Sequence, residues 1–224
     1  MAKREYVQLA KMYKPSDYII GAYVSEKLDG MRAIWDGGVT RGMWAHNVEY
    51  ANTLKDKSTV RCTGLWSRRG KAIQAPDWWL DRLPNFPLDG ELFCGDFQVL
   101  MTIARCKIPS DKDWQSVIYY AFDSPRMDVF AGQEFCRKHN IDVIPFMSFP
   151  ETLEFMKTEL KESDLLKLHK QEVVTSVKDV MDRLPHVFEG LMIRKTPLWE
   201  PSRSSNMLKI KNSQEAEATV VGYQ

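Results

Sequence analysis

This sequence of 224 residues lacks the spacing patterns of a metal site or a disulfide-rich protein. Its four cysteines lie far apart with no CxxC pair, and its four histidines form no HExxH or similar pattern. A zinc site and a disulfide framework are therefore disfavoured, and we expect reduced thiols in a cytoplasmic protein. The cysteines concerned are Cys62, Cys94, Cys106 and Cys136.

Long apolar runs are also absent. No stretch approaches the roughly 20 apolar residues of a membrane-spanning helix. Residues 1–14 are charged and contain no apolar signal-peptide core. We therefore expect no membrane association and a cytoplasmic location, which for a viral protein would be the cytoplasm of the host cell.

An excess of charge of one sign is missing as well, because 31 basic and 30 acidic side chains leave a net charge of +1. This balance argues only weakly against tight nonspecific binding to DNA, since a local basic groove remains compatible with it. Internal repeats and low-complexity linkers are not found. The composition is that of an ordinary globular protein, large enough for one large domain or two small ones.

The hydrophobic pattern mixes strands and helices without a regular βαβ rhythm, which indicates an α+β fold with largely antiparallel sheets. A short helix is expected over residues 6–13, where Tyr6, Leu9 and Tyr13 recur at helical spacing. The other expected helices cover residues 76–83, 130–139, 151–160 and 171–184. Strands are expected at residues 18–24, 31–35, 88–93, 117–122, 141–146, 190–195 and 207–211.

A motif near the N-terminus contains the candidate reactive lysine. Residues 27–32 read KLDGMR. A lysine amine can attack phosphorus to form a phosphoramidate only when it is unprotonated, so Lys27 would need neighbours that favour the neutral amine. Lys209, Lys211 and a bound metal ion are the candidate cations. Taken alone, a KxDG match is a weak signal, because short patterns arise by chance.

Four further elements follow this motif in a fixed order: LDGEL at residues 88–92, YAFD at 120–123, EGLMIR at 189–194 and LKIK at 208–211. Together the five elements resemble the motifs of the covalent nucleotidyltransferases, which comprise DNA ligases, RNA ligases and mRNA capping enzymes. They span nearly the whole chain.

The resemblance is closer to the small bacterial and phage ATP-dependent DNA ligases. It rests on VSEKLDG at residues 24–30, WSRRGK at 66–71, APDW at 75–78 and PLDGEL at 87–92. EAEATVVG at residues 215–222 resembles the point at which those ligases enter an OB domain. The strand-like run at residues 218–223 is expected to be the first strand of a further domain.

The resemblance implies an ATP-grasp-like nucleotidyltransferase domain over residues 1–214, in which helices flank two largely antiparallel sheets and the nucleotide site lies between them. Residues 215–224 would begin an OB domain. Lys27 would take AMP from ATP with Mg²⁺, or Mn²⁺, and pass it to the 5′-phosphate of nicked double-stranded DNA. The 3′-hydroxyl would then seal the nick. We expect the protein to act as a monomer.

Two pairs of charged residues have expected roles. Lys209 and Lys211 project from one face of a strand, where they would hold the α-phosphate as pyrophosphate leaves, although a solvated strand face is the alternative. By resemblance, Glu91 reaches the ribose or the metal region, and Glu189 helps to hold the divalent ion. Asp89 is left without a role, with turn capping as its alternative.

The resemblance also assigns the residues around the nucleotide. Phe122 would stack on adenine rather than serve only as a core residue. Arg32 and Arg68 would contact the ribose or the 5′-phosphate. Glu26 counts among the nucleotide-binding residues, but larger family members carry a glutamate two positions before the lysine, so the adenine contact stays unassigned. For Arg194, a salt bridge and a ligand contact are both open.

Other interpretations remain open. Residues 196–206 are either a flexible DNA-contacting loop or an ordinary surface loop. Without an OB domain, charging from ATP should be slow. The rival functions are an RNA ligase, a capping-type nucleotidyltransferase, or a weak nick- or nucleotide-binding module. Five retained charged residues argue against the binding module: Lys27, Glu91, Glu189, Lys209 and Lys211.

Overall fold

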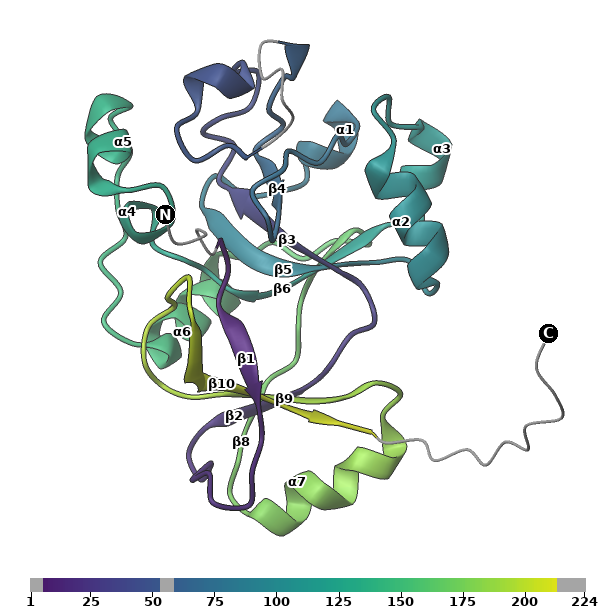
Figure 1. Ribbon diagram of the computed structural model, residues 1–224, viewed down its shortest axis with the longest axis vertical. Coiled ribbons are helices and arrows are strands. Elements are labelled where there is room, and N and C mark those ends of the chain that lie inside the picture. Colours follow the sequence, from purple (N-terminus) through teal and green to yellow (C-terminus); the bar gives the residue numbers. More distant parts are fainter. Residues whose placement is uncertain (1–5, 53–58, 213–224) are drawn as a thin grey trace, which may run out of the picture.

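Two five-stranded sheets lie one above the other, with helices around them (Figure 1). The structure is a computed structural model that describes residues 6–52 and 59–212. Most strand pairs are antiparallel, and two are parallel. The predicted α+β class with two largely antiparallel sheets flanked by helices is confirmed.

The lower sheet has the strand order β1-β10-β9-β2-β8. The first and last strands along the chain are neighbours in this sheet, because β1 pairs in parallel with β10. Helix α7 (Val177–Arg183) lies below this sheet (Figure 1). The strands are β1 (Leu9–Met12), β2 (Tyr23–Glu26), β8 (Glu172–Val173), β9 (Gly190–Arg194) and β10 (Arg203–Lys211).

The upper sheet has the order β4-β3-β5-β6-β7. Its central strand β5 pairs antiparallel with β3 and β6, and Arg32 lies opposite Glu91 in the β3–β5 register. The strands are β3 (Met31–Asp36), β4 (Leu65–Ser67), β5 (Pro87–Phe93), β6 (Ile118–Asp123) and β7 (Leu166–Leu168).

Two hydrophobic cores cover the faces of the upper sheet. One contains residues of α1, α2 and α6, and the other contains residues of α4 and α5 together with Tyr6 and Val7. Polar caps begin several of these helices; Asp96, for example, accepts from the Val99 amide before α2. The helices are α1 (Asp77–Leu80), α2 (Phe97–Arg105), α3 (Asp111–Trp114), α4 (Met127–Phe130), α5 (Gln133–Lys138) and α6 (Phe149–Glu159).

Two predicted elements were wrong. Residues 6–13 do not form a helix, because the backbone bonds to β10 and its approach instead: the Leu9 amide donates to Ser202 O at 2.9 Å and the Tyr13 amide to Lys209 O at 3.0 Å. Residues 141–146 form no strand. In both segments the tertiary context overrode the local pattern.

Other boundaries also differ from the prediction. The helix expected over residues 130–139 is split into α4 and α5, with Gly132 between them at φ +99°. The helix expected over 171–184 is shortened to α7, since β8 occupies its beginning. Helix α2 and strand β7 were not predicted. Among the described residues, no helix is both long and apolar enough to cross a membrane.

Candidate active site

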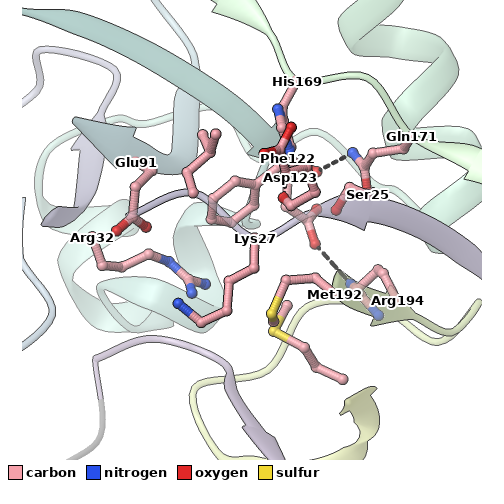
Figure 2. Close-up of a pocket in the computed structure, with 13 residues that line it drawn as sticks. Ser25, Lys27, Arg32, Glu91, Phe122, Asp123, His169, Gln171, Met192 and Arg194 are labelled. Atoms are coloured by element: carbon pink, nitrogen blue, oxygen red, sulfur yellow. Dashed lines mark hydrogen bonds and ion pairs between the residues drawn. The ribbon is translucent and has the colours of Figure 1, made fainter. Parts of the chain in front are cut away.

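A pocket opens between the two sheets, and Lys27 and Arg32 of the lysine motif line it (Figure 2). It brings together five of the residues predicted from sequence: Glu26, Lys27, Arg32, Glu91 and Phe122. Residues without a predicted role complete the lining: Ser25, Leu28, Asp123, His169, Gln171, Met192 and Met207, together with Arg194.

Lys27 is held where β2 ends. Its backbone amide donates to Gly190 O at 2.8 Å, and its side-chain amine forms an ion pair with Oε1 of Glu189. Both side chains are about a quarter exposed, at 24% and 28%. The Oε2 atom of Glu189 is buried and has no hydrogen-bond partner among the described residues. The predicted nucleophile and a predicted metal ligand are therefore in direct contact.

The glycines of two motifs are required by close packing. A Cβ at Gly30 would collide with the carbonyl oxygen of Leu92, so the turn after Lys27 approaches β5 closely only with glycine there. Gly190 has φ +136°, and a Cβ there would collide with the carbonyl oxygen of Ile210. These contacts set the distance between the lysine, β5 and β10.

Arg32 points into the pocket from β3, and Asp89 holds it there. Its Nε lies 2.5 Å from Oδ1 of Asp89 and its Nη2 lies 2.6 Å from Oδ2. Its guanidinium carbon sits 4.6 Å from the centre of the Phe122 ring. Asp89 is fully buried within β5. It therefore does not cap a turn, the alternative left open from sequence, but serves as the buried partner of Arg32.

Glu91 lies in the same pocket, and burial raises its pKa to about 8. The positive charges of Arg32 and Lys27 act in the opposite direction but do not outweigh the loss of hydration. A bound cation would lower the pKa of Glu91 again, because it would stabilise the ionised carboxylate.

One part of the lining is apolar. Leu28, Phe122, Met192 and Met207 supply side chains without charge, and the Phe122 backbone carbonyl accepts from Nε2 of Gln171 at 2.8 Å. Flat aromatic rings and polarizable thioethers make good contacts with a planar ring system. This wall is suited to a nucleobase.

Arg194 forms a buried salt bridge, one of its two open roles. Its Nη2 lies 3.0 Å from Oδ2 of Asp123, and its guanidinium lies 4.5 Å from the centre of the Phe149 ring. Burial raises the pKa of Asp123, and the neighbouring Arg194 lowers it, with burial the larger effect. The pair joins β9 of the lower sheet to β6 of the upper sheet.

Two lining residues had no signal in the sequence. His169 follows β7, and its Nε2 lies 2.8 Å from the carbonyl oxygen of Glu26. Burial lowers the pKa of His169, so the neutral ring is favoured. Gln171 lies two residues later, beside Phe122 (Figure 2). Both occupy an irregular connection without a motif, and only the chain path brings them to the pocket.

Besides Glu189, three residues predicted to contact a ligand lie outside the pocket lining. Lys209 is half-buried, and its pKa is lowered first by burial and then by the positive charges of Lys211, Arg203 and Lys27. It is therefore electrostatically close to the pocket. Lys211 is exposed at the end of β10, and Arg68 is exposed in the turn after β4. Contacts of these residues with phosphate stay predictions.

No protein-family model matches the chain. It is 26% identical over 208 residues to a DNA ligase of Haemophilus influenzae, a match that covers 92% of this chain and 63% of that protein. The chain thus spans less than two thirds of this relative's length.

Solved structures agree with this relationship. A Lig E DNA ligase, described as binding DNA with a minimal scaffold, superposes with a TM-score of 0.64 at 27% identity, over 92% of this chain and 68% of that one. The Chlorella virus DNA ligase-adenylate shares the fold with a TM-score of 0.58 at 19% identity, over 94% and 68%. The predicted similarity to ATP-dependent DNA ligases, and the fold that it implied, are confirmed.

Proposed function

We propose that this chain, which has the fold of DNA ligase cores, is the nucleotidyltransferase core of an ATP-dependent DNA ligase in which Lys27 becomes adenylated. One observation carries the proposal. The Lys27 amine pairs with Glu189, and Lys27 lines a pocket between the two sheets together with Glu91 and the apolar side chains of Phe122 and Met192. This arrangement suits a group that attacks phosphorus next to a bound nucleobase and a divalent ion.

The nucleobase belongs against Phe122 and Met192. Both side chains line the pocket (Figure 2). Gln171 and Ser25 add polar atoms to the same wall, which supply candidate hydrogen-bond partners for the edge of adenine. Phe122 therefore keeps its predicted stacking role, and Gln171 becomes a candidate for the base contact left unassigned from sequence.

The donor set fits a magnesium ion. Glu189, which pairs with Lys27, carries a buried oxygen without a partner among the described residues, and Glu91 is a partly buried carboxylate that lines the pocket. Among the described residues there is no group of three or more metal-ligating side chains. That composition suits Mg²⁺, which uses few protein carboxylates and fills its shell with water and phosphate oxygens. When bound, it would neutralise charge on the phosphates.

The reaction we propose has three phosphoryl transfers. Lys27 Nζ loses its proton to solvent and bonds to the α-phosphorus of ATP, while the bond to the bridging oxygen breaks and pyrophosphate leaves. An oxygen of the DNA 5′-phosphate then attacks the same phosphorus, the P–N bond breaks, and the Lys27 amine leaves and takes up a proton from solvent. Last, the 3′-hydroxyl loses its proton to solvent and its oxygen attacks the 5′-phosphorus, while the bond to the AMP oxygen breaks and AMP departs.

Catalysis of these steps rests on positioning and charge. Arg32 is pre-oriented by Asp89 and points into the pocket, so its positive charge faces the space for the phosphates. Lys209 and Lys211 follow on β10, where mutual repulsion would be relieved by an anion between them. Arg68, on the turn after β4, is proposed to contact the 5′-phosphate.

The proposed domain covers residues 1–214. The OB domain predicted to begin at residue 215 concerns residues outside the described ranges, so it stays a prediction. We propose nicked double-stranded DNA as the substrate, a monomer as the active form and the cytoplasm as its location.

Intact mass spectrometry tests the nucleophile. The purified chain is incubated with ATP and Mg²⁺ beside Lys27→Ala, and Lys178→Ala serves as a control at an exposed lysine paired with Asp182. A gain of one AMP by the parent and the control, but not by Lys27→Ala, is expected. An adduct on Lys27→Ala would overturn the assignment of the nucleophile.

Sealing assays test the substrate. Nicked DNA is compared with nicked RNA, and ATP with GTP; preference for RNA or GTP would favour an RNA ligase or a capping-type enzyme. If no adduct forms, a pre-adenylated nick bypasses the first two transfers and tests the third. Sealing of that nick would keep the ligase function, and its failure would favour a nick- or nucleotide-binding module.

A further inference from the structure

Trp199 lies in the connection between β9 and β10, outside every motif recognised in the sequence. Its side chain is only 5% exposed. Its indole Nε1 donates a hydrogen bond to Oδ2 of Asp89, at 2.6 Å. The donor follows a strand of the lower sheet and the acceptor belongs to the central strand of the upper sheet. This bond therefore crosses between the two sheets next to the pocket.

Asp89 receives this bond on the same oxygen that Arg32 uses. Oδ2 accepts from Nη2 of Arg32 as well as from Trp199, while Oδ1 accepts from Nε of Arg32. Asp89 is fully buried, so water cannot replace a lost donor readily. The indole N–H thus restricts the carboxylate to the orientation in which it holds Arg32 from two sides.

Arg32 depends on this carboxylate for its direction. Its guanidinium also makes a long hydrogen bond from Nη2 to Gln8 O, at 3.3 Å, and contacts the face of Phe122. Neither fixes rotation of the head group as a two-point bond to Asp89 does. A change in the orientation of Asp89 would therefore pass directly to a cation that faces the pocket.

Core packing and backbone hydrogen bonds fix the position of Trp199. Its ring packs in the core that contains Tyr6 and Val7, and it meets the edge of Phe130 with ring centres 6.4 Å apart. The connection is tied at both ends, where the Phe149 amide donates to Thr196 O at 2.8 Å and the Leu9 amide to Ser202 O at 2.9 Å. A donor on so constrained a segment can orient its acceptor.

We propose that Trp199 is a positioning residue for Arg32, acting through Asp89. It touches no reacting atom. Its indole N–H holds the Asp89 carboxylate, and the carboxylate holds the guanidinium toward the phosphates of the substrate. The kinetic consequence rests on the proposed ligase function, whereas the structural relationship does not.

Trp199→Phe removes the N–H donor and keeps an aromatic ring. The proposal expects the rate of nick sealing at saturating substrate to fall about ten- to a hundredfold, the range for losing a hydrogen bond to a buried charged group. Trp79→Phe is the matched control, because Trp79 is 1% exposed and donates to Val117 O at 2.9 Å, away from the pocket. This control should lose stability but keep its rate.

NMR tests the positioning without any assay of activity. The Nε–H signal of Arg32, assigned by its loss in Arg32→Lys, should exchange slowly with solvent in the parent and in Trp79→Phe. In Trp199→Phe it should exchange at least about tenfold faster, because the carboxylate that protects it is less constrained. An unchanged exchange rate in Trp199→Phe would overturn the proposal, whether or not the protein is a ligase.

Two further measurements cover the remaining cases. Should Trp199→Phe fail to fold, the indole N–H of Trp199 is followed in the parent, and rapid solvent exchange of that signal would refute the bond to Asp89.

Where sealing is measurable, the double variant Trp199→Phe/Arg32→Lys should be no slower than Arg32→Lys alone. Multiplying effects would mean that Trp199 acts by another route. A parent that neither charges nor seals would refute the ligase function and leave the exchange test to decide the role of Trp199.

Discussion

Arg194 of β9 and Asp123 of β6 form a buried ion pair that joins the lower and upper sheets, with Nη2 3.0 Å from Oδ2. The two side chains are 5% and 3% exposed. Because they line the pocket between the sheets, the pair links the folding of the domain to the shape of its candidate active site. The positive charge of Arg194 does not fully offset the effect of burial on the pKa of Asp123.

Breaking this pair from one side should destabilise the fold strongly. Asp123→Ala leaves the Arg194 charge buried and unpaired, so we expect a loss of about 3–5 kcal/mol in the free energy of unfolding. Urea denaturation measures it. Lys178→Ala, which breaks an exposed pair with Asp182, should cost no more than about 0.5 kcal/mol. A similar small cost for both variants would contradict the structural importance of the buried pair.

Lys27→Arg separates charge from nucleophilicity. The guanidinium keeps a positive charge beside Glu189, so the melting temperature should stay close to that of the parent. It cannot act as the amine nucleophile, because arginine remains protonated in proteins. Intact mass spectrometry after incubation with ATP should therefore find no AMP adduct. Lys178→Arg, the control, should form the AMP adduct as fully as the parent.

Glu189→Gln should raise the concentration of Mg²⁺ needed for formation of the AMP adduct on Lys27. The amide keeps the size of the side chain but lacks the negative charge that favours a divalent ion, and even indirect perturbations of metal sites commonly cost about 10- to 100-fold in affinity. The measurement is a Mg²⁺ titration of adduct formation at fixed ATP. Glu154→Gln, at an exposed position on α6, should leave the titration unchanged. An unaltered Mg²⁺ requirement in Glu189→Gln would argue that Glu189 is not a metal ligand.

The contribution of His169 to stability should depend on pH. Burial lowers the pKa of His169 in the folded protein below its ordinary value of 6.5, so the unfolded chain binds the proton more readily. Its stabilising contribution is therefore complete above about pH 6.5 and is lost as the pH falls through the folded pKa. The difference in unfolding free energy between the parent and His169→Asn should shrink from pH 7 to pH 5.

The exposed His46 offers the matching control for that experiment. His46→Asn removes a histidine that does not line the pocket, and it is measured over the same range to control for the loss of a histidine as such. A difference for His169→Asn that grows as the pH falls would mean that the histidine gains rather than loses favourable contacts on protonation.

Strands with strong local patterns were predicted from sequence, and elements decided by distant partners were not. The apolar residues of β3, β5, β6 and β9 located these strands to within a few residues. The helical spacing of Tyr6, Leu9 and Tyr13 was misleading, because pairing with β10 decides the conformation there. A segment's own pattern cannot reveal a partner strand nearly two hundred residues away.

The sequence by itself determined which charged and aromatic side chains to expect in the pocket, since Lys27, Glu91 and Phe122 belong to motifs whose order identifies the family resemblance. Tertiary structure alone decided how that pocket is supported. Trp199 reaches Asp89 across 110 positions and Arg194 reaches Asp123 across 71. Motifs record groups that react or bind, whereas the groups that orient them are selected by proximity in the folded chain, where burial makes each hydrogen bond and charge pair specific.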